Sequence, residues 1–121
     1  MILLDTNILI EILKGDRRTI EKVESLNERA AISAISAMEL YFGARDKAEM
    51  RKLERFVSLF EIIHLNYEIS TLAMKLIQKY AKSHTLDIPD GLIAATALTQ
   101  RCRLFTYNRK DFRYIEGLML F

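Results

Sequence analysis

Three carboxylates occupy positions where a simple hydrophobic core would not place them. Asp5 ends an apolar run, Glu39 shares a predicted helix face with apolar neighbours, and Asp90 lies in the first turn of a strongly apolar helix. Burying an unpaired carboxylate costs free energy, and carboxylates brought together raise one another's pKa. A divalent cation removes both costs, and a ligand set made only of oxygens suits Mg²⁺ or Mn²⁺ rather than zinc. These acids therefore predict a metal site.

Each of these acids also has a purely structural explanation. Asp5 can cap the helix that follows it, and Glu39 is the expected partner of Ser36 in a capping box. Asp90, with Asp87 just before it, can stabilise a helix amino terminus through the macrodipole. Because the same dipole would keep Glu39 and Asp90 ionised, as metal ligands must be, capping and metal binding do not exclude each other. The metal prediction gains weight because all three acids would fall near one edge of one sheet.

The elements that must position these acids alternate along the chain. We expect short apolar strands at residues 2–4, 31–33, 61–65, 103–106 and 117–121. The spacing of apolar residues predicts helices near 8–13, 16–23, 36–43, 46–60, 66–80 and 89–101. Short apolar strands separated by helices indicate a mostly parallel sheet covered on both faces, which is a three-layer α/β/α arrangement of the α/β class. Such sheets bind ligands at the carboxyl ends of their strands, where Asp5 stands.

The composition narrows the class of protein. The 121 residues are 50% hydrophobic and 28% charged, with 1 Pro and scattered glycines, so we expect a single globular domain over residues 1–121. Because Cys102 is the single cysteine, no internal disulfide can form, and we expect its side chain to be a small buried hydrophobic group. No uncharged apolar stretch approaches the roughly 18 residues of a membrane helix, and the expected location is the cytoplasm. The net charge of +2 permits a polyanionic partner without arguing for one.

Four segments of the chain carry a resemblance to a known family. They are Leu3–Ile10, Ser36–Ala44, Ile88–Ala97 and Leu104–Phe112. In order and spacing they resemble the acidic motifs of the PIN-domain family, and the short chain is similar to the VapC-type toxins of bacterial and archaeal toxin–antitoxin pairs. The likeness covers essentially the whole chain.

The resemblance implies a PIN-like fold and a Mg²⁺-dependent (or Mn²⁺-dependent) endoribonuclease that hydrolyses RNA phosphodiester bonds. It further implies a cognate antitoxin that makes the enzyme inactive, with a segment packed into a hydrophobic groove, and a soluble homodimer. A structured tRNA is the substrate that the resemblance suggests first. DNA would be bound only indirectly, through the antitoxin.

The resemblance also implies roles for individual residues. Asp5 and Asp90 would hold the metal most directly, and Glu39 would complete the cluster or position water. Many family members have an acid where this chain has Asn108. Either Asn108 offers a neutral oxygen or the nearby Asp111 reaches in as the fourth acidic, catalytic group.

Other polar residues of the four segments would support this site. Thr6 and Thr106 are candidates for hydrogen bonds to the metal ligands, which usually need such support. Because an acidic site repels RNA, positive charge must lie around it, and Arg109, Lys110 and Arg113 are candidates for binding phosphates. The alternative for these three residues is an ordinary solvated surface.

A second functional class also fits the sequence. A non-catalytic PIN-like module that binds RNA or protein would keep the fold and the basic residues but would not turn over substrate. The missing acid at Asn108 is the feature that favours it. Metal titration distinguishes the two classes, because such a module would neither bind Mn²⁺ at the three acids nor cut RNA.

Overall fold

Four parallel strands form the centre of the molecule. The computed structural model describes residues 1–121, and its strands are β1 (Ile2–Leu4), β2 (Ala30–Ser33), β3 (Glu61–Ile63) and β4 (Arg103–Phe105). The strand order is β3-β2-β1-β4, and every neighbouring pair is parallel. In the middle strand Leu3 lies opposite Ala31 on one side and Leu104 on the other. The predicted parallel sheet is confirmed, and all of its named strands are parallel.

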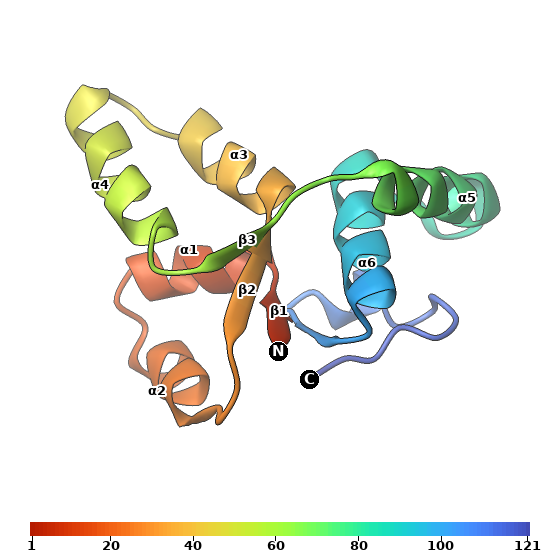
Figure 1. Cartoon of the computed structure of the whole chain (residues 1–121), viewed down its shortest axis with the longest axis horizontal. Coiled ribbons are helices and arrows are strands. Elements are labelled where there is room, and N and C mark those ends of the chain that lie inside the picture. Colours follow the sequence, from red (N-terminus) through yellow and green to blue (C-terminus); the bar gives the residue numbers. More distant parts are fainter.

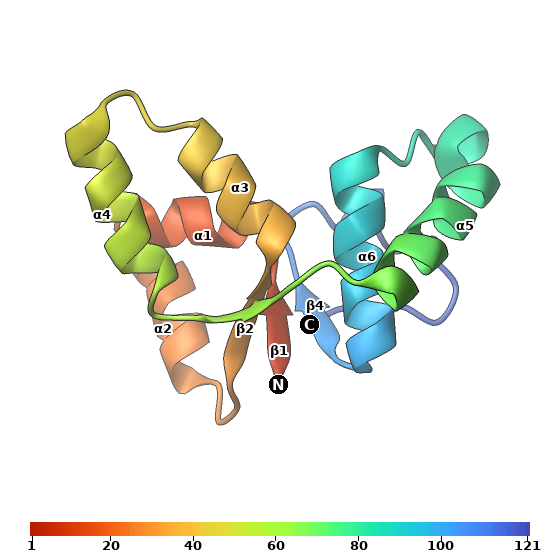
Figure 2. The ribbon, with the colours of Figure 1, turned by 45° about the horizontal axis from the view of Figure 1, so that its top comes forward.

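Helices cover both faces of this sheet (Figure 1). They are α1 (Thr6–Leu13), α2 (Arg17–Ser25), α3 (Ala34–Phe42), α4 (Lys47–Val57), α5 (Tyr67–His84) and α6 (Ile88–Gln100), with a short 3₁₀ turn, η1 (Arg109–Asp111). Figure 2 shows α1, α2 and α4 on one side of the strands and α5 and α6 on the other. Successive side chains of β1 point to opposite faces of the sheet. Leu3 therefore packs in the core under α5 and α6, whereas Ile2 and Leu4 pack in the core under α1, α3 and α4. The predicted three-layer architecture is therefore confirmed.

Helices α5 and α6 approach each other closely at the start of α6. Gly91 is buried there, and a Cβ atom added to it would lie 2.9 Å from Cγ1 of Ile77 on α5. The rest of α6 is apolar on nearly all sides, as predicted, with Ile93, Ala94 and Ala97 almost fully buried. This packing fixes the amino-terminal turn of α6, which carries Asp90.

The predicted capping box at Ser36 is wrong. Helix α3 begins two residues earlier, because Ser33 at the end of β2 caps it by accepting a hydrogen bond from the backbone N–H of Ile35 (3.2 Å). Ser36 is instead buried within the helix. Glu39 therefore lies well inside α3, where the macrodipole argument for its ionisation does not apply.

The prediction of a strand at the carboxyl terminus is also wrong. Residues 117–121 contribute only an isolated parallel bridge between Leu120 and Leu104. Gly117 has a φ of +83°, so the chain turns at this point, and only a single residue pairs with the edge of β4. Other bounds differ by a few residues: β3 ends at Ile63, and α5 continues to His84. No helix in the structure has the length and apolar character needed to span a bilayer.

Candidate active site

Asp5 is the most firmly held of the predicted site residues. It follows β1 and caps α1, and its side chain is only 5% exposed. One carboxylate oxygen accepts a hydrogen bond from the backbone N–H of Thr6 (2.8 Å). The other accepts a hydrogen bond from Oγ1 of Thr106, at the end of β4 (2.7 Å). The capping role and the position at the carboxyl edge of the sheet are thus both observed.

Thr6 connects Asp5 to the second acid. Its hydroxyl donates to Oε1 of Glu39 on α3 (2.7 Å), and its oxygen also lies 2.8 Å from Oγ of Ser36. Glu39 is exposed, and this bond anchors one oxygen of its carboxylate. Three segments that are far apart in the sequence therefore meet at the carboxyl ends of β1, β2 and β4.

Asp90 lies in the first turn of α6, where its backbone N–H donates to the capping carboxylate of Asp87 (2.9 Å). Its own carboxyl is half-buried and accepts no hydrogen bond from the protein. Burial raises the pKa of Asp90 to about 7, and the negative charges of Asp87, Asp5, Asp111 and Glu39 add to the effect. Four other carboxylates therefore act on Asp90 at once.

The pKa of Asp5 is raised by the same two causes. Burial is the largest, and the charges of Glu39 and Asp111 add to it, while the hydrogen bonds from Thr106 and Thr6 oppose it. Asp111, on the exposed turn η1, thus acts on both Asp5 and Asp90. No group of three or more histidine, cysteine or acidic side chains is gathered closely enough to hold an ion. The acids lie within electrostatic range, and which of them coordinate a metal remains a prediction.

Thr106 and Asn7 fasten the end of β4 to the end of β1. The Thr106 hydroxyl, which donates to Asp5, accepts from the backbone N–H of Asn108 (3.0 Å) and from Nδ2 of Asn7 (3.3 Å). Asn7 in turn accepts from the backbone N–H of Tyr107 (3.2 Å). The sequence analysis assigned Asn7 no role in the site, although three consecutive polar residues after a buried strand are a signal for such contacts. The exposed Asn108 side chain makes no hydrogen bond.

Tyr114 is a further residue that the sequence did not reveal. Its hydroxyl is buried and has no hydrogen-bond partner. Burial raises the pKa of this phenol, and the charges of Asp90, Asp111 and Asp87 raise it further. The phenol therefore stays protonated, as a donor near the acids.

The three predicted phosphate-binding residues are all exposed. Arg109 donates to the backbone carbonyl of Phe121 (2.7 Å). Lys110 and Arg113 take part in none of the ion pairs of the structure, whereas Arg103 is paired with Glu28 (2.8 Å). Lys110 and Arg113 thus keep their charge available to an anion.

The chemistry of the site fits a hard divalent cation. Its possible ligands are all oxygens, and Asp90 has a raised pKa that positive charge would lower. No histidine or cysteine lies among the groups that act on Asp5 or Asp90. Such a set is typical of Mg²⁺ or Mn²⁺ rather than of zinc.

Comparison with known proteins agrees with this fold. The family model described as PIN domain matches residues 2–118, and the chain belongs to the PIN-domain family. The chain is similar to Ribonuclease VapC1 of Rickettsia felis, with 35% identity over 97% of this chain and 92% of that protein.

Two solved structures are also similar to it. A toxin–antitoxin complex from Klebsiella pneumoniae aligns with a TM-score of 0.83 and 34% identity, over 98% of this chain and 96% of that one. VapBC2 from Rickettsia felis, bound to a DNA fragment from its promoter, aligns with a TM-score of 0.85 and 30% identity. The alignment covers all of this chain and 98% of the VapBC2 chain.

Proposed function

We propose that this chain is a Mg²⁺-dependent endoribonuclease, the toxin of a toxin–antitoxin pair. The observation that carries the proposal is geometric: Thr6 joins the carboxylates of Asp5 and Glu39 through hydrogen bonds at the carboxyl edge of the sheet. Asp90 lies within electrostatic range of both, and its pKa is raised by burial first and by neighbouring carboxylates second. Perturbed groups of this kind cluster at functional sites. The similarity to proteins named ribonuclease VapC supports RNA as the substrate.

In this proposal Asp5, Asp90 and Glu39 would hold the ion after their side chains move closer together than they lie in this structure, and Asp111 or Asn108 would complete its environment. An ion held there would supply positive charge to orient the phosphate and to lower the pKa of the attacking water. The protein contributes by holding its acids: Thr106 fixes Asp5 and Thr6 fixes Glu39. We assign Glu39, which is exposed, to orient the attacking water through its free oxygen.

An antitoxin partner is supported by the similarity to a solved toxin–antitoxin complex. The helix that carries Glu39 also exposes large apolar side chains, since Phe42 is 94% exposed and Met38 is 53% exposed. An apolar segment packed against α3 would bury them beside the acids.

A homodimer is supported by an apolar hollow of about 430 Å³ between α5 and α6, lined by Met74, Ile77 and Leu92 among others. Light scattering at micromolar concentration tests for the dimer, and a monomer would contradict it.

The experiment that tests the activity is incubation of the purified protein with total cellular RNA, with Mg²⁺ or with EDTA, followed by mapping of the cut ends. We expect cleavage only with Mg²⁺, and a roughly thousandfold loss for Asp5→Asn and for Asp90→Asn. Glu68→Gln on α5 is the matched control, because this exposed acid lies outside the site, and it should keep full activity. Full cleavage in EDTA, or normal cleavage by Asp90→Asn, would overturn the proposal.

The non-catalytic binding module remains the second candidate, because Asn108 replaces an acid of the family pattern and its side chain makes no hydrogen bond. Mn²⁺ titration by calorimetry distinguishes the two. Binding that is lost in Asp90→Asn favours the enzyme. No Mn²⁺ binding, together with no cleavage, favours the module.

A further inference from the structure

Tyr107 is an aromatic residue that immediately follows Thr106 of the acidic site, and its side chain is held from more than one direction. Its hydroxyl is hydrogen-bonded to the hydroxyl of Thr19 on α2. Because the single hydroxyl proton of Thr19 goes to Asp16 (2.6 Å), Tyr107 is the donor in this bond. Its ring packs edge-to-face with that of Phe105, with 5.5 Å between ring centroids and planes at 77°. The ring orientation is therefore fixed.

The fixed ring nevertheless remains accessible, since Tyr107 is 42% exposed. It lines a surface hollow of about 380 Å³ together with Asn108, Arg109, Lys110 and Asp111. The ammonium group of Lys22 lies 5.7 Å from the centre of the ring. One hollow thus joins an aromatic ring, basic side chains and an acid that acts on Asp5 and Asp90.

An accessible aromatic ring beside cationic groups matches the chemistry of a single-stranded nucleic acid. An unpaired base stacks on such a ring, and the neighbouring phosphates meet the positive charges. Neither Arg109 nor Lys110 in this hollow takes part in an ion pair, but Arg109 donates to the backbone carbonyl of Phe121, which leaves Lys110 as the cation with no side-chain hydrogen bond. A rigid ring also loses little conformational freedom when a base stacks on it.

We propose that Tyr107 is a stacking platform for an unpaired base of the RNA next to the cleaved phosphate, with Lys110 binding a flanking phosphate. This inference rests on the proposed ribonuclease function and adds to it a binding subsite for a base. It also implies that the cleaved segment is single-stranded at this position. The competing explanation is that Tyr107 only ties β4 to α2 through Thr19.

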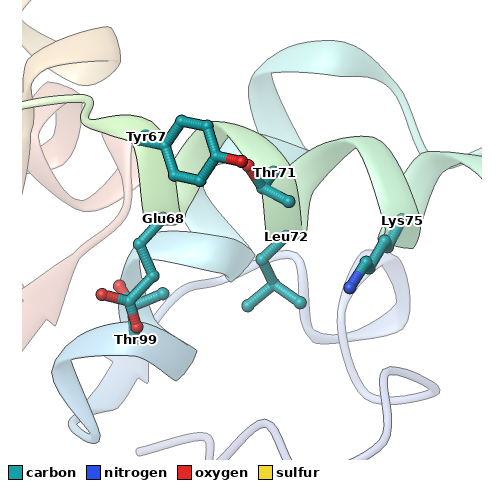
Figure 3. Close-up of a pocket in the computed structure, with 6 residues that line it drawn as sticks. All are labelled: Tyr67, Glu68, Thr71, Leu72, Lys75 and Thr99. Atoms are coloured by element: carbon teal, nitrogen blue, oxygen red, sulfur yellow. The ribbon is translucent and has the colours of Figure 1, made fainter.

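The absence of tryptophan from the chain provides a direct test. Tyr107→Trp introduces a single fluorophore at the platform, and Tyr67→Trp introduces one at a matched control position. Tyr67 is 87% exposed and lies at the start of α5, in a pocket that also contains Lys75 and none of the acids of the candidate site (Figure 3). Both substitutions are made in an Asp90→Asn background so that the RNA stays intact. The probes are oligouridine and an abasic oligonucleotide of the same length.

We expect oligouridine to lower the emission of the Tyr107→Trp variant by roughly half, because a stacked base quenches the indole. The abasic probe, which has phosphates but no bases, should bind without this quenching, and the Tyr67→Trp variant should respond to neither probe. Binding of oligouridine with unchanged emission from the Tyr107→Trp variant would overturn the platform and leave the ribonuclease proposal intact. No oligouridine binding, even by the protein with Tyr107 unchanged, would overturn both.

Two further variants separate stacking from the structural tie. Tyr107→Ala removes the ring, and we expect it to weaken oligouridine binding about tenfold in fluorescence anisotropy. Tyr107→Phe keeps the ring but loses the bond to Thr19, and its affinity should stay within about twofold of the parent. Equal losses in the two variants would assign Tyr107 to the structural tie and overturn the platform.

Discussion

Asp5 and Asp90 are two acids of the candidate site, and the protein holds them in different ways. Asp5, at the end of β1, accepts hydrogen bonds on both oxygens, from the Thr6 backbone and from the Thr106 hydroxyl. Asp90, in the first turn of α6, has only its backbone N–H engaged, by Asp87. Burial raises the pKa of both carboxyls, but only Asp5 has hydrogen bonds that oppose the shift.

This difference shows that the fold offsets the repulsion between like charges at one of the two positions and leaves it uncompensated at the other. The end of β1 is preorganised, since donors from two elements stabilise the ionised form of Asp5. The start of α6 keeps an unpartnered carboxyl that is stabilised by protonation or by a positive ligand. The close packing at Gly91 holds this carboxyl near the others in spite of the repulsion.

The prediction with the largest expected effect concerns the hydrogen bond that Thr106 donates to the carboxylate of Asp5. Thr106→Val keeps the shape of the side chain and removes the hydroxyl that donates to the buried carboxylate (2.7 Å). Hydrogen bonds to charged groups are worth more than neutral ones, so we expect the free energy of unfolding at neutral pH to fall by about 2 kcal/mol. The deficit should shrink in acid as Asp5 takes up a proton. Urea denaturation at several pH values measures it.

The matched control for this variant is Thr96→Val. Thr96 is fully buried like Thr106, but its hydroxyl bonds only to the backbone carbonyl of Leu92 in its own helix (2.7 Å). This change should cost less than about 1 kcal/mol, with no dependence on pH. Equal losses of unfolding free energy in the two valine variants would show that the hydrogen bond to the Asp5 carboxylate stabilises the fold no more than a neutral hydrogen bond does.

The second prediction concerns Asp90 in metal-free protein. Its pKa is about 7 in the folded state against 3.8 for the unperturbed group. The folded state therefore binds more protons than the unfolded state between these values, and stability falls as the pH rises from about 4 to 7. The shift sets an upper limit of about 4 kcal/mol, which screening at a half-exposed group reduces to about 1 kcal/mol.

Asp90→Asn removes this penalty. In EDTA near pH 8 we expect the variant to be more stable than the parent by about 1 kcal/mol, with no gain near pH 4. Saturating Mg²⁺ should reverse the order, because only the parent gains binding energy from the ion. Glu68→Gln, at an exposed acid, serves as the control without effect. A variant that is less stable than the parent at pH 8 in EDTA would contradict the raised pKa.

The sequence predicted the parts of this comparison that depend on local pattern. The apolar run before Asp5 and the apolar periodicity of α6 placed both acids on the correct elements. The capping box failed because a local motif at Ser36 cannot show that Ser33, at a strand end, caps the helix first. The carboxyl-terminal strand failed because apolar content does not report the turn at Gly117.

Contacts between distant segments lay beyond such reasoning. Thr6 and Thr106 were expected to support metal ligands, but their partners, Glu39 and Asp5, depend on how strands β1 and β4 and helix α3 meet in space. The hydrogen bond between Tyr107 and Thr19 joins residues 88 positions apart. No periodicity within one segment contains that information.

The smallest expected effect concerns the fourth group of the site, where the chain offers Asp111 and Asn108. Asp111 raises the pKa of both Asp5 and Asp90, whereas the exposed side chain of Asn108 has no hydrogen bond. An exposed charge contributes less than about 1 kcal/mol, so Asp111→Asn should weaken Mn²⁺ binding about threefold in calorimetry. Asn108→Ala, which removes a neutral amide, should leave the affinity unchanged. The opposite ranking would assign the fourth ligand to the Asn108 oxygen and would mean that Asp111 acts only through its negative charge on Asp5 and Asp90.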